Sequence, residues 1–394
     1  MLVVGKLETE HDNYRWRILA MTYVCQLSFA LIFQSMPPIL RLIISELKMT
    51  HAQAGLLMSL FALPGIFLAI PSGIISDRLG AKKVGVASLV LMIIGTFLAG
   101  SSDGFFLMAL GRAVSGIGAM TLTIILPQLL SHWFMHKELG LGMGLFNTAM
   151  PLGTIISFNA LSIIGTNLGW RASIFVTTVF CVGSLLGFLL LFREPTSNPR
   201  ESRTSAMLEV SKAGKPIWLV GLTWMWFNAA FISFLTFVPD FFAAKGYEIV
   251  SASFFSSIVM TGSLFLSPLV GYLVSKFGKE EMFIAIASTV LASLIFFIST
   301  ATSPIPTLAL IAIFVAFVPA PIFSLPSKIV KPQNLGLAFG ILATCSNIGV
   351  LAGPYLVGLT KDLTGDYVFS FYLMSFFAAL TGLTILFLYL FKGK

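Results

Sequence analysis

Long apolar stretches recur from one end of the chain to the other. An α-helix needs about 20 apolar residues to cross roughly 30 Å of hydrocarbon. Stretches of that length are expected to be helical near residues 18–40, 53–75, 83–101, 105–130, 139–164, 171–192, 216–240, 252–275, 281–300, 306–327, 335–360 and 367–391. Only 10% of the residues are charged, too few to cover a water-facing globule. The sequence therefore predicts an all-α membrane protein with twelve transmembrane helices.

Basic residues gather in alternate segments between these predicted spans. Eighteen Lys and Arg residues lie on the side of the N-terminus, five lie on the opposite side, and Arg112 lies within a span. Because cytoplasmic loops carry the excess of Lys and Arg, both termini are expected in the cytoplasm. The same rule explains the net charge of +8, so no nucleic-acid partner is expected.

The chain repeats itself. LGLGMGLFNTAMPLG (139–153) aligns with LGLAFGILATCSNIG (335–349) at an offset of 196, with six identical positions. Residues 71–83 align more loosely with 268–281, matching Gly73 to Gly271 and Gly80 to Gly278 at an offset of 198. Such repeats are typical of transporters built from two similar halves. We predict two pseudo-symmetric six-helix bundles, 1–192 and 216–394, joined by a cytoplasmic linker, 193–215.

The segment GIISDRLGAKK (73–83) resembles the loop between the second and third helices of the major facilitator superfamily. The sequence RAVSGIG, from Arg112 to Gly118, resembles the RxxxGxG element of that family, and GWR (169–171) is also common there. The pattern is most similar to the prokaryotic branch of nitrate/nitrite and cyanate-type porters, which implies a location in the cytoplasmic (plasma) membrane of a bacterium or archaeon. Nitrate porters carry a substrate arginine in the second and eighth spans, and 53–75 and 252–275 contain none. The resemblance implies a secondary transporter that works by alternating access, and not for nitrate.

The resemblance also implies a conformational latch on the inner side of the membrane. In the family fold, Asp77 lies near the start of the eleventh span, around 334–336, where exposed amides and the helix dipole favour a carboxylate. The residues of this predicted latch are Gly73, Asp77, Arg78, Gly80, Lys82 and Lys83. The three basic residues have a second interpretation, because any cytoplasmic loop is expected to be rich in Lys and Arg.

Arg112 is the one charge clearly inside a predicted span, and intramembrane charges are usually functional. It is a candidate anchor for an anionic substrate, since guanidinium matches carboxylate geometry. The alternative is a structural residue bonded to Gln26 or Gln34. No histidine lies in the middle of a span, and Asp240 is the deepest acid. The chain is therefore a uniporter or exchanger, moves a proton together with a weak-acid substrate at Arg112, or carries the proton on Asp240.

The resemblance places the first, fourth, seventh and tenth helices around a central cavity. Helical spacing there groups amide and aromatic side chains that suit a small amphipathic solute. The candidate substrate-binding residues, besides Arg112, are Tyr23, Gln26, Gln34, Trp224, Asn228, Phe231 and Asn347. The alternative for each aromatic ring is ordinary packing against a neighbouring helix or lipid. The amides are the better candidates, because an unpartnered buried amide is costly.

These patterns lead to one main functional prediction and two alternatives. We predict a secondary transporter, monomeric in the lipid bilayer, for a small organic solute, in the first instance an organic anion such as a monocarboxylate. Whether a proton or another ion is transported together with the solute stays an open question. The alternatives are an efflux carrier for amphipathic compounds and a non-transporting receptor on the same fold. No nucleophile–base pair or metal-ligand cluster stands at membrane depth, so no enzyme, cofactor or metal site is expected.

Overall fold

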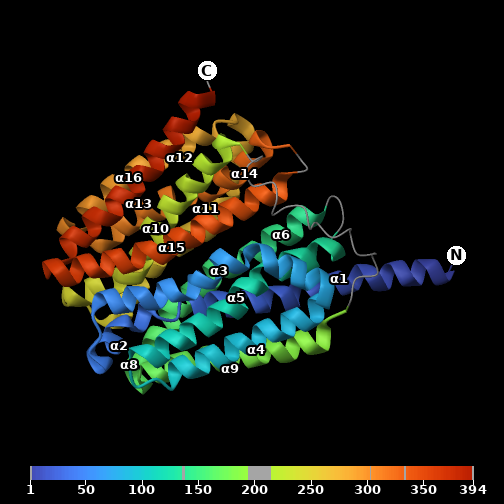
Figure 1. Ribbon diagram of the computed structural model, residues 1–394, viewed down its shortest axis with the longest axis horizontal. Helices are drawn as coiled ribbons and strands as arrows, with labels where there is room; N and C mark the ends of the chain where they lie inside the picture. The colour runs from blue at the N-terminus through green and yellow to red at the C-terminus, as the bar shows by residue number, and fades with distance from the viewer. Residues whose placement is uncertain (1, 135–137, 194–213, 302, 332–333, 393–394) are drawn as a thin grey trace.

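The protein is described here by a computed structural model that covers residues 2–134, 138–193, 214–301, 303–331 and 334–392 (Figure 1). Within these ranges it is all-helical, and twelve helices are long and apolar enough to cross a membrane. This confirms the predicted fold class. Nearly all of the predicted linker, 193–215, lies outside the described residues.

Two successive sets of helices make up the structure. The first set consists of α1 (Leu2–Phe33), η1 (Pro37–Ile39), α2 (Leu40–Leu47), α3 (His51–Leu79), α4 (Ala81–Gly100), α5 (Phe105–Trp133), α6 (Leu139–Asn147), α7 (Ala149–Ile156), the π-helical η3 (Ser157–Leu161), α8 (Ser162–Leu168) and α9 (Trp170–Leu191). The second set consists of α10 (Lys215–Ala244), α11 (Ile249–Phe277), α12 (Glu280–Phe297), η5 (Ile298–Thr300), α13 (Pro304–Ala316), α14 (Pro319–Ile329), α15 (Leu335–Thr364) and α16 (Tyr367–Lys392).

Several spans are assembled from shorter pieces, among them the first, fifth and tenth. The first span stops at Phe33, turns through η1 and continues as α2, because Pro37 and Pro38 have no N–H to donate to a continuous helix. The tenth span is interrupted between α13 and α14, just before Pro319. The fifth span runs through α6, α7, η3 and α8, and η3 contains a wider turn of the kind often found at functional sites. The broken first span leaves helix-terminal carbonyls inside the protein.

The two sets lie side by side, with α1–α9 in the lower part and α10–α16 in the upper part of Figure 1. They meet mainly along α3 and α15. A Cβ atom built on Gly55 would lie 2.1 Å from the carbonyl oxygen of Pro354, and one built on Gly358 would lie 2.2 Å from that of His51. Only glycine allows backbones to approach so closely. We call the end of the spans that holds α2 and the start of α3 the His51 end.

Two glycines of the RxxxGxG element have a packing role. A Cβ atom on Gly116 would lie 2.2 Å from the carbonyl oxygen of Phe61 on α3, and one on Gly118 would lie 2.2 Å from that of Ser88 on α4. The element therefore brings α5 into backbone contact with both neighbours, which fixes the depth of Arg112 between them.

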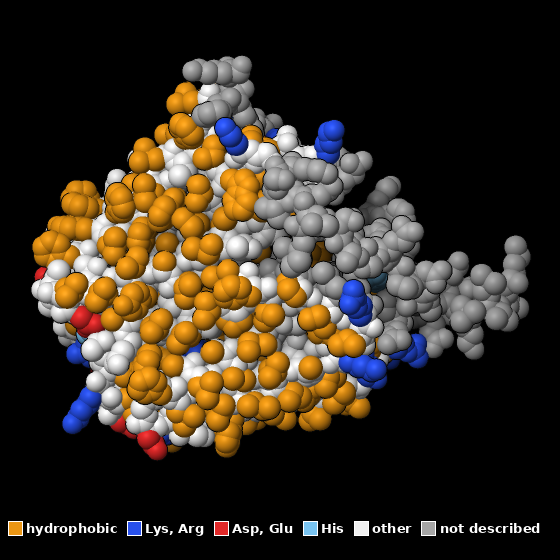
Figure 2. Space-filling model, in the orientation of Figure 1, with side chains coloured by type: hydrophobic (Ala, Val, Ile, Leu, Met, Phe, Trp, Pro, Cys, Tyr) orange, Lys and Arg blue, Asp and Glu red, His pale blue; other side chains and the backbone are white. Residues whose placement is uncertain are grey.

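The surface of the protein has an apolar middle and charged edges, as a membrane environment requires. Figure 2 shows hydrophobic side chains across the middle of the visible face, with Lys, Arg, Asp and Glu side chains toward its edges. Large apolar residues are highly exposed, for example Phe106 and Leu190, which are 86% and 81% exposed. An apolar surface of this extent suits contact with lipid.

Candidate functional site

Arg112 is completely enclosed between the first, second and fourth spans. Its side chain is 2% exposed. The guanidinium donates from Nε to the carbonyl oxygen of Leu57 at 3.1 Å, and from its terminal nitrogens to those of Ile32 at 2.8 Å and Phe33 at 3.2 Å. One face of the guanidinium lies 4.4 Å from the centre of the Phe61 ring.

The partners of Arg112 explain why a charge stands there. The last carbonyls of an α-helix have no partner within the helix, and Ile32 and Phe33 are the last two residues of α1. A cation at this position satisfies these carbonyls and interacts favourably with the helix dipole. In this conformation the guanidinium is therefore occupied by backbone oxygens and is closed to solvent, which favours the structural interpretation. The partners are main-chain carbonyls, where we had expected the side chains of Gln26 or Gln34.

The candidate residues of the first helix lie in different surroundings. Tyr23 is half-buried, with its hydroxyl 3.2 Å from that of Thr148 on the fifth span. The side-chain oxygens of Gln26 and Gln34 are buried without a hydrogen-bond partner among the described residues. Gln34 is only 1% exposed. An unsatisfied buried acceptor costs free energy, so both amides have capacity for an added donor.

Aromatic rings from three helices form one cluster in the second set. Trp224 stacks on Phe227 at 5.3 Å and meets the edge of Phe323 at 5.2 Å, Phe227 lies 5.4 Å from Phe231, and Phe323 lies 6.4 Å from Phe339. These five residues, from α10, α14 and α15, are called the aromatic cluster below. Trp224 and Phe231 are partly accessible, and Phe323 and Phe339 are exposed. The cluster therefore offers accessible aromatic surface.

Asn228 and Asn347 lie on α10 and α15. The amide nitrogen of Asn228 donates to the carbonyl oxygen of Trp224 at 2.8 Å, and that of Asn347 donates to Ala343 at 3.0 Å. A Cβ atom on Gly65 of α3 would lie 2.6 Å from the Asn347 side chain, so this amide packs against the first set of helices. In both amides, one N–H donates to a carbonyl of the same helix, and further hydrogen-bonding capacity remains.

Two hollows are found in the second set of helices alone. A groove of about 390 Å³ runs along α12, η5 and α13 past Thr289, Ser293 and Phe297. A void of about 10 Å³ lies behind α10, next to Phe227 and Phe231, and is too small for most solutes. Neither is lined by a residue of α1–α9, so neither is a passage between the two sets.

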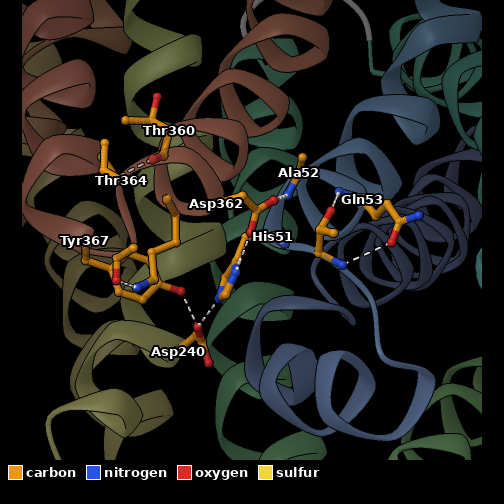
Figure 3. Close-up of polar contacts among 12 residues, drawn as sticks. His51, Ala52, Gln53, Asp240, Thr360, Asp362, Thr364 and Tyr367 are labelled. Atoms are coloured by element: carbon orange, nitrogen blue, oxygen red, sulfur yellow. Dashed lines mark hydrogen bonds and ion pairs between the residues drawn. The ribbon is translucent and has the colours of Figure 1, made fainter.

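A polar network joins the two sets at the His51 end (Figure 3). The ring nitrogen Nδ1 of His51 lies 3.0 Å from Oδ1 of Asp362, and Nε2 lies 3.4 Å from Oδ2 of Asp240. Asp240 also accepts a hydrogen bond from the hydroxyl of Tyr367 and lies 3.4 Å from Arg41. His51 and Arg41 belong to the first set, whereas the two aspartates and Tyr367 belong to the second.

The carboxylate of Asp362 also caps α3. It accepts from the backbone N–H of His51 at 2.9 Å and from that of Ala52 at 2.7 Å. Free amides at a helix N-terminus favour an anion, and here the anion comes from the other set of helices. In the described part of the chain, polar contacts between the sets gather in this half of the spans; farther in, Asn159 donates to Ser257 at 3.2 Å and Ser59 to Val350 at 3.4 Å.

The predicted latch is only partly described. Gly80 turns the chain between α3 and α4 with φ +86°, which a residue with a side chain rarely adopts. Arg78 and Lys83 are exposed, and Lys82 lies 6.0 Å from the centre of the Phe192 ring. The surroundings of Gly73 and the side chain of Asp77 lie outside the described residues. The latch therefore stays a prediction.

Sequence reasoning identified Asp240 but missed the residues around it. His51 and Asp362 stand at the ends of spans, where charged residues are common, and Arg41 and Tyr367 carry no motif. One local signal was available. Thr50 and Gln53 form a capping box, which marks His51 as the first residue of a helix. Phe323 and Phe339 were missed because single phenylalanines in an apolar chain do not stand out.

Comparisons with known proteins agree with this architecture. The model of the Major Facilitator Superfamily matches residues 22–324. A lysosomal dipeptide transporter, MFSD1 of Danio rerio, is 26% identical and aligns over 95% of this chain and 87% of its own length. A probable sulfoacetate transporter, SauU of Cupriavidus necator, is 23% identical over 83% of this chain and 82% of its own length. The crystal structure of the nucleoside transporter NupG shares the fold with a TM-score of 0.78 and 16% identity, covering 96% of this chain and 99% of that one.

Proposed function

The chain belongs to the Major Facilitator Superfamily, and we propose that it carries a small organic solute across the membrane by alternating access between α1–α9 and α10–α16. The observation that supports this proposal most strongly is the distribution of contacts between the sets. The two sets of helices are held together by the polar network around His51 and by close backbone contact at Gly55 and Gly358. Contacts of this kind at one end can separate without unfolding either set, as alternating access requires.

We further propose that the solute carries a carboxylate. A dipeptide and sulfoacetate, the solutes named for two relatives, are both carboxylates. Arg112 is occupied by the end of α1, so in this proposal it supports the fold. The solute carboxylate would instead meet the amide N–H groups of Asn228 and Asn347 and the rings of the aromatic cluster, while the unpartnered oxygen of Gln26 would accept from an N–H or O–H of the solute. Neutral donors in a sheltered site bind an anion while allowing its release.

The orientation is part of the same proposal. The excess of basic residues on the side of the N-terminus favours both termini in the cytoplasm. The His51 end would then face outward, and the described conformation would be closed on that side. The two sets, 1–192 and 216–394, would be the moving bodies. The likeness to the nitrate/nitrite and cyanate-type branch rests on sequence motifs alone, and a carboxylate solute is consistent with the missing nitrate arginines.

An efflux carrier for amphipathic compounds is the second candidate, and the accessible aromatic cluster favours it. The two candidates differ in the ligands they bind. A carboxylate carrier binds small acids and ignores larger hydrophobic cations, whereas such an efflux carrier does the reverse.

A ligand panel tests the proposal. The purified protein is heated with dipeptides, monocarboxylates, hexuronates, nucleosides and hydrophobic cations, and hits are then assayed for uptake into proteoliposomes. A ligand at 100 times its Kd adds about 2.7 kcal/mol to folded-state stability, so we expect a clear rise in melting temperature with one class of carboxylate. Stabilisation by the cations alone would reject this proposal in favour of efflux, and ligands that bind without crossing the membrane would indicate a receptor.

Removal of the Trp224 ring should weaken binding of the carboxylate selected by that panel. Stacking on an aromatic ring contributes about 0.5–1.5 kcal/mol, so we expect Trp224→Ala to raise Kd by roughly two- to tenfold. The measurement is calorimetric titration. Trp218→Ala is the matched control, because Trp218 lies on the same helix, is 41% exposed and is not in the aromatic cluster. Equal affinities in the two variants would show that the aromatic cluster is not part of the binding site.

A further inference from the structure

The imidazole of His51 has a carboxylate at each of its two nitrogens. Nδ1 lies 3.0 Å from Asp362 and Nε2 lies 3.4 Å from Asp240 (Figure 3). A neutral imidazole carries one N–H, and its other nitrogen is an acceptor. An ionised carboxylate can only accept. Both contacts are therefore favourable at the same time only when His51 carries a second proton.

The charges around His51 lead to the same conclusion. The groups that face it or lie beside it are Arg41 on α2, Lys48 just before α3, Asp240 on α10, Lys361 and Asp362 on α15, Asp366 in the following turn and Tyr367 on α16. Lys361 bonds to the carbonyl oxygen of Gly365, and Lys48 is exposed. Within the network itself, two carboxylates face one permanent cation, Arg41. A proton on His51 balances the charge of this group, in which Asp240 is buried, His51 is partly exposed, and Arg41 and Asp362 are exposed.

The proton also bridges the two sets of helices. His51 is the first residue of α3, whereas Asp240 and Asp362 come from α10 and α15. If the sets separate at this end, His51 loses both carboxylates and meets water, where the pKa of histidine is about 6.5. The closed state, in which both carboxylates face His51, binds the proton more tightly than the open state. The closed state therefore gains population as the pH falls.

The geometry points to a proton-binding site formed by His51, Asp240 and Asp362, whose occupancy closes the His51 end of the carrier. This inference rests on the proposed alternating-access function. It adds a ligand, the proton, and the direction in which pH shifts the conformation. Acid closes the His51 end, and alkali opens it. Asp240, which the sequence singled out as a coupling residue, acts here as one of two carboxylates that hold the protonated imidazole.

Two pairs of spin labels can follow both ends of the full chain in nanodiscs, with the three native cysteines replaced by alanine. Ser45 on α2 and Glu248 at the start of α11 report on the His51 end, and Leu141 on α6 and Ser327 on α14 report on the opposite end; all four residues are exposed. Between about pH 8.5 and 5.5, which brackets histidine titration, we expect the short-distance population of the first pair to rise roughly tenfold. The second pair should lengthen over the same range.

Substitutions at His51 decide whether this response comes from the proposed site. His51→Gln keeps a polar side chain that cannot titrate and should abolish the pH response. His51→Arg keeps a permanent charge and should hold the end closed at both pH values. His132→Gln is the matched control, because His132 is exposed and bonds to the Gln128 carbonyl of its own helix; it should respond as wild type does.

A pH response in His51→Gln equal to that of wild type would overturn the proton site, and so would the absence of a response in wild type. The arginine variant keeps the test decisive if the glutamine variant does not fold, since a wild-type response in it would also overturn the site. These outcomes are separate from those of the ligand panel. Failure to transport any solute rejects the proposed function, whereas the distance measurement needs no solute.

Discussion

Arg112→Ala is expected to destabilise the protein more than any other single substitution considered for this chain. The variant removes three hydrogen bonds and leaves the terminal carbonyl of Phe33 without a donor, whereas the carbonyl of Ile32 still accepts from the Ser35 hydroxyl and Leu57 lies inside α3. A buried unsatisfied polar group costs about 1–3 kcal/mol, and the cavity left beneath Phe61 adds to that loss of stability. The measurement is thermal unfolding in detergent, followed by intrinsic tryptophan fluorescence.

Two further variants show which property of Arg112 matters. Arg112→Lys keeps the charge and part of the donor set, and it should recover part of the lost stability. Arg17→Ala removes an exposed arginine from α1 and should leave the melting temperature close to that of wild type. If Arg112→Ala melts like wild type but fails to bind the carboxylate selected by the panel, the structural role assigned to Arg112 is wrong and the substrate-anchor interpretation is restored.

Gly358→Val is expected to abolish transport by preventing closure of the His51 end. A Cβ atom at this position would lie 2.2 Å from the carbonyl oxygen and 2.6 Å from the carbonyl carbon of His51, and backbone atoms cannot rotate aside. The two sets must separate there, which removes Asp362 from the start of α3. We expect uptake to fall by at least tenfold, since about 1.4 kcal/mol of bias already shifts an equilibrium by that factor.

The same labels at Ser45 and Glu248 should report long distances in Gly358→Val at every pH. Gly183→Val on α9 is the matched control, because no heavy atom lies within 4 Å of a Cβ built there. Short distances and normal uptake in Gly358→Val would show that α3 and α15 do not need backbone contact during transport.

The predicted residues illustrate what a sequence can and cannot reveal about a site of this kind. Trp224, Asn228 and Phe231 recur at helical spacing, and the structure places all three on α10, but their role in substrate binding stays a prediction. Asp240 was found because a carboxylate deep in an apolar stretch is unusual. Its partners were missed because residues 41, 51, 240, 362 and 367 come from five separate helices, and no spacing rule connects them.

Arg112 shows a related limit, because its position was evident from the sequence and its role was not. Its presence within a span was evident from the sequence, but the sequence left its role open between substrate and structure. That choice depends on where α1 ends. The end of α1 at Phe33 and the approach of α5 through Gly116 bring the guanidinium to three backbone carbonyls, and backbone carbonyls leave no trace in residue identity.

The sequence by itself determined the helix class, the number of spans and the likeness to the Major Facilitator Superfamily. These follow from hydrophobic length, charge and short motifs, which are properties of neighbouring residues. Only the tertiary structure decided the partners of Arg112 and His51. Hydrogen bonds act over about 3 Å, and packing of helices far apart in the sequence alone brings their donors and acceptors within that distance. The apolar stretches thus specify that the chain lies in a membrane, whereas the packing of its helices determines which groups surround Arg112 and His51.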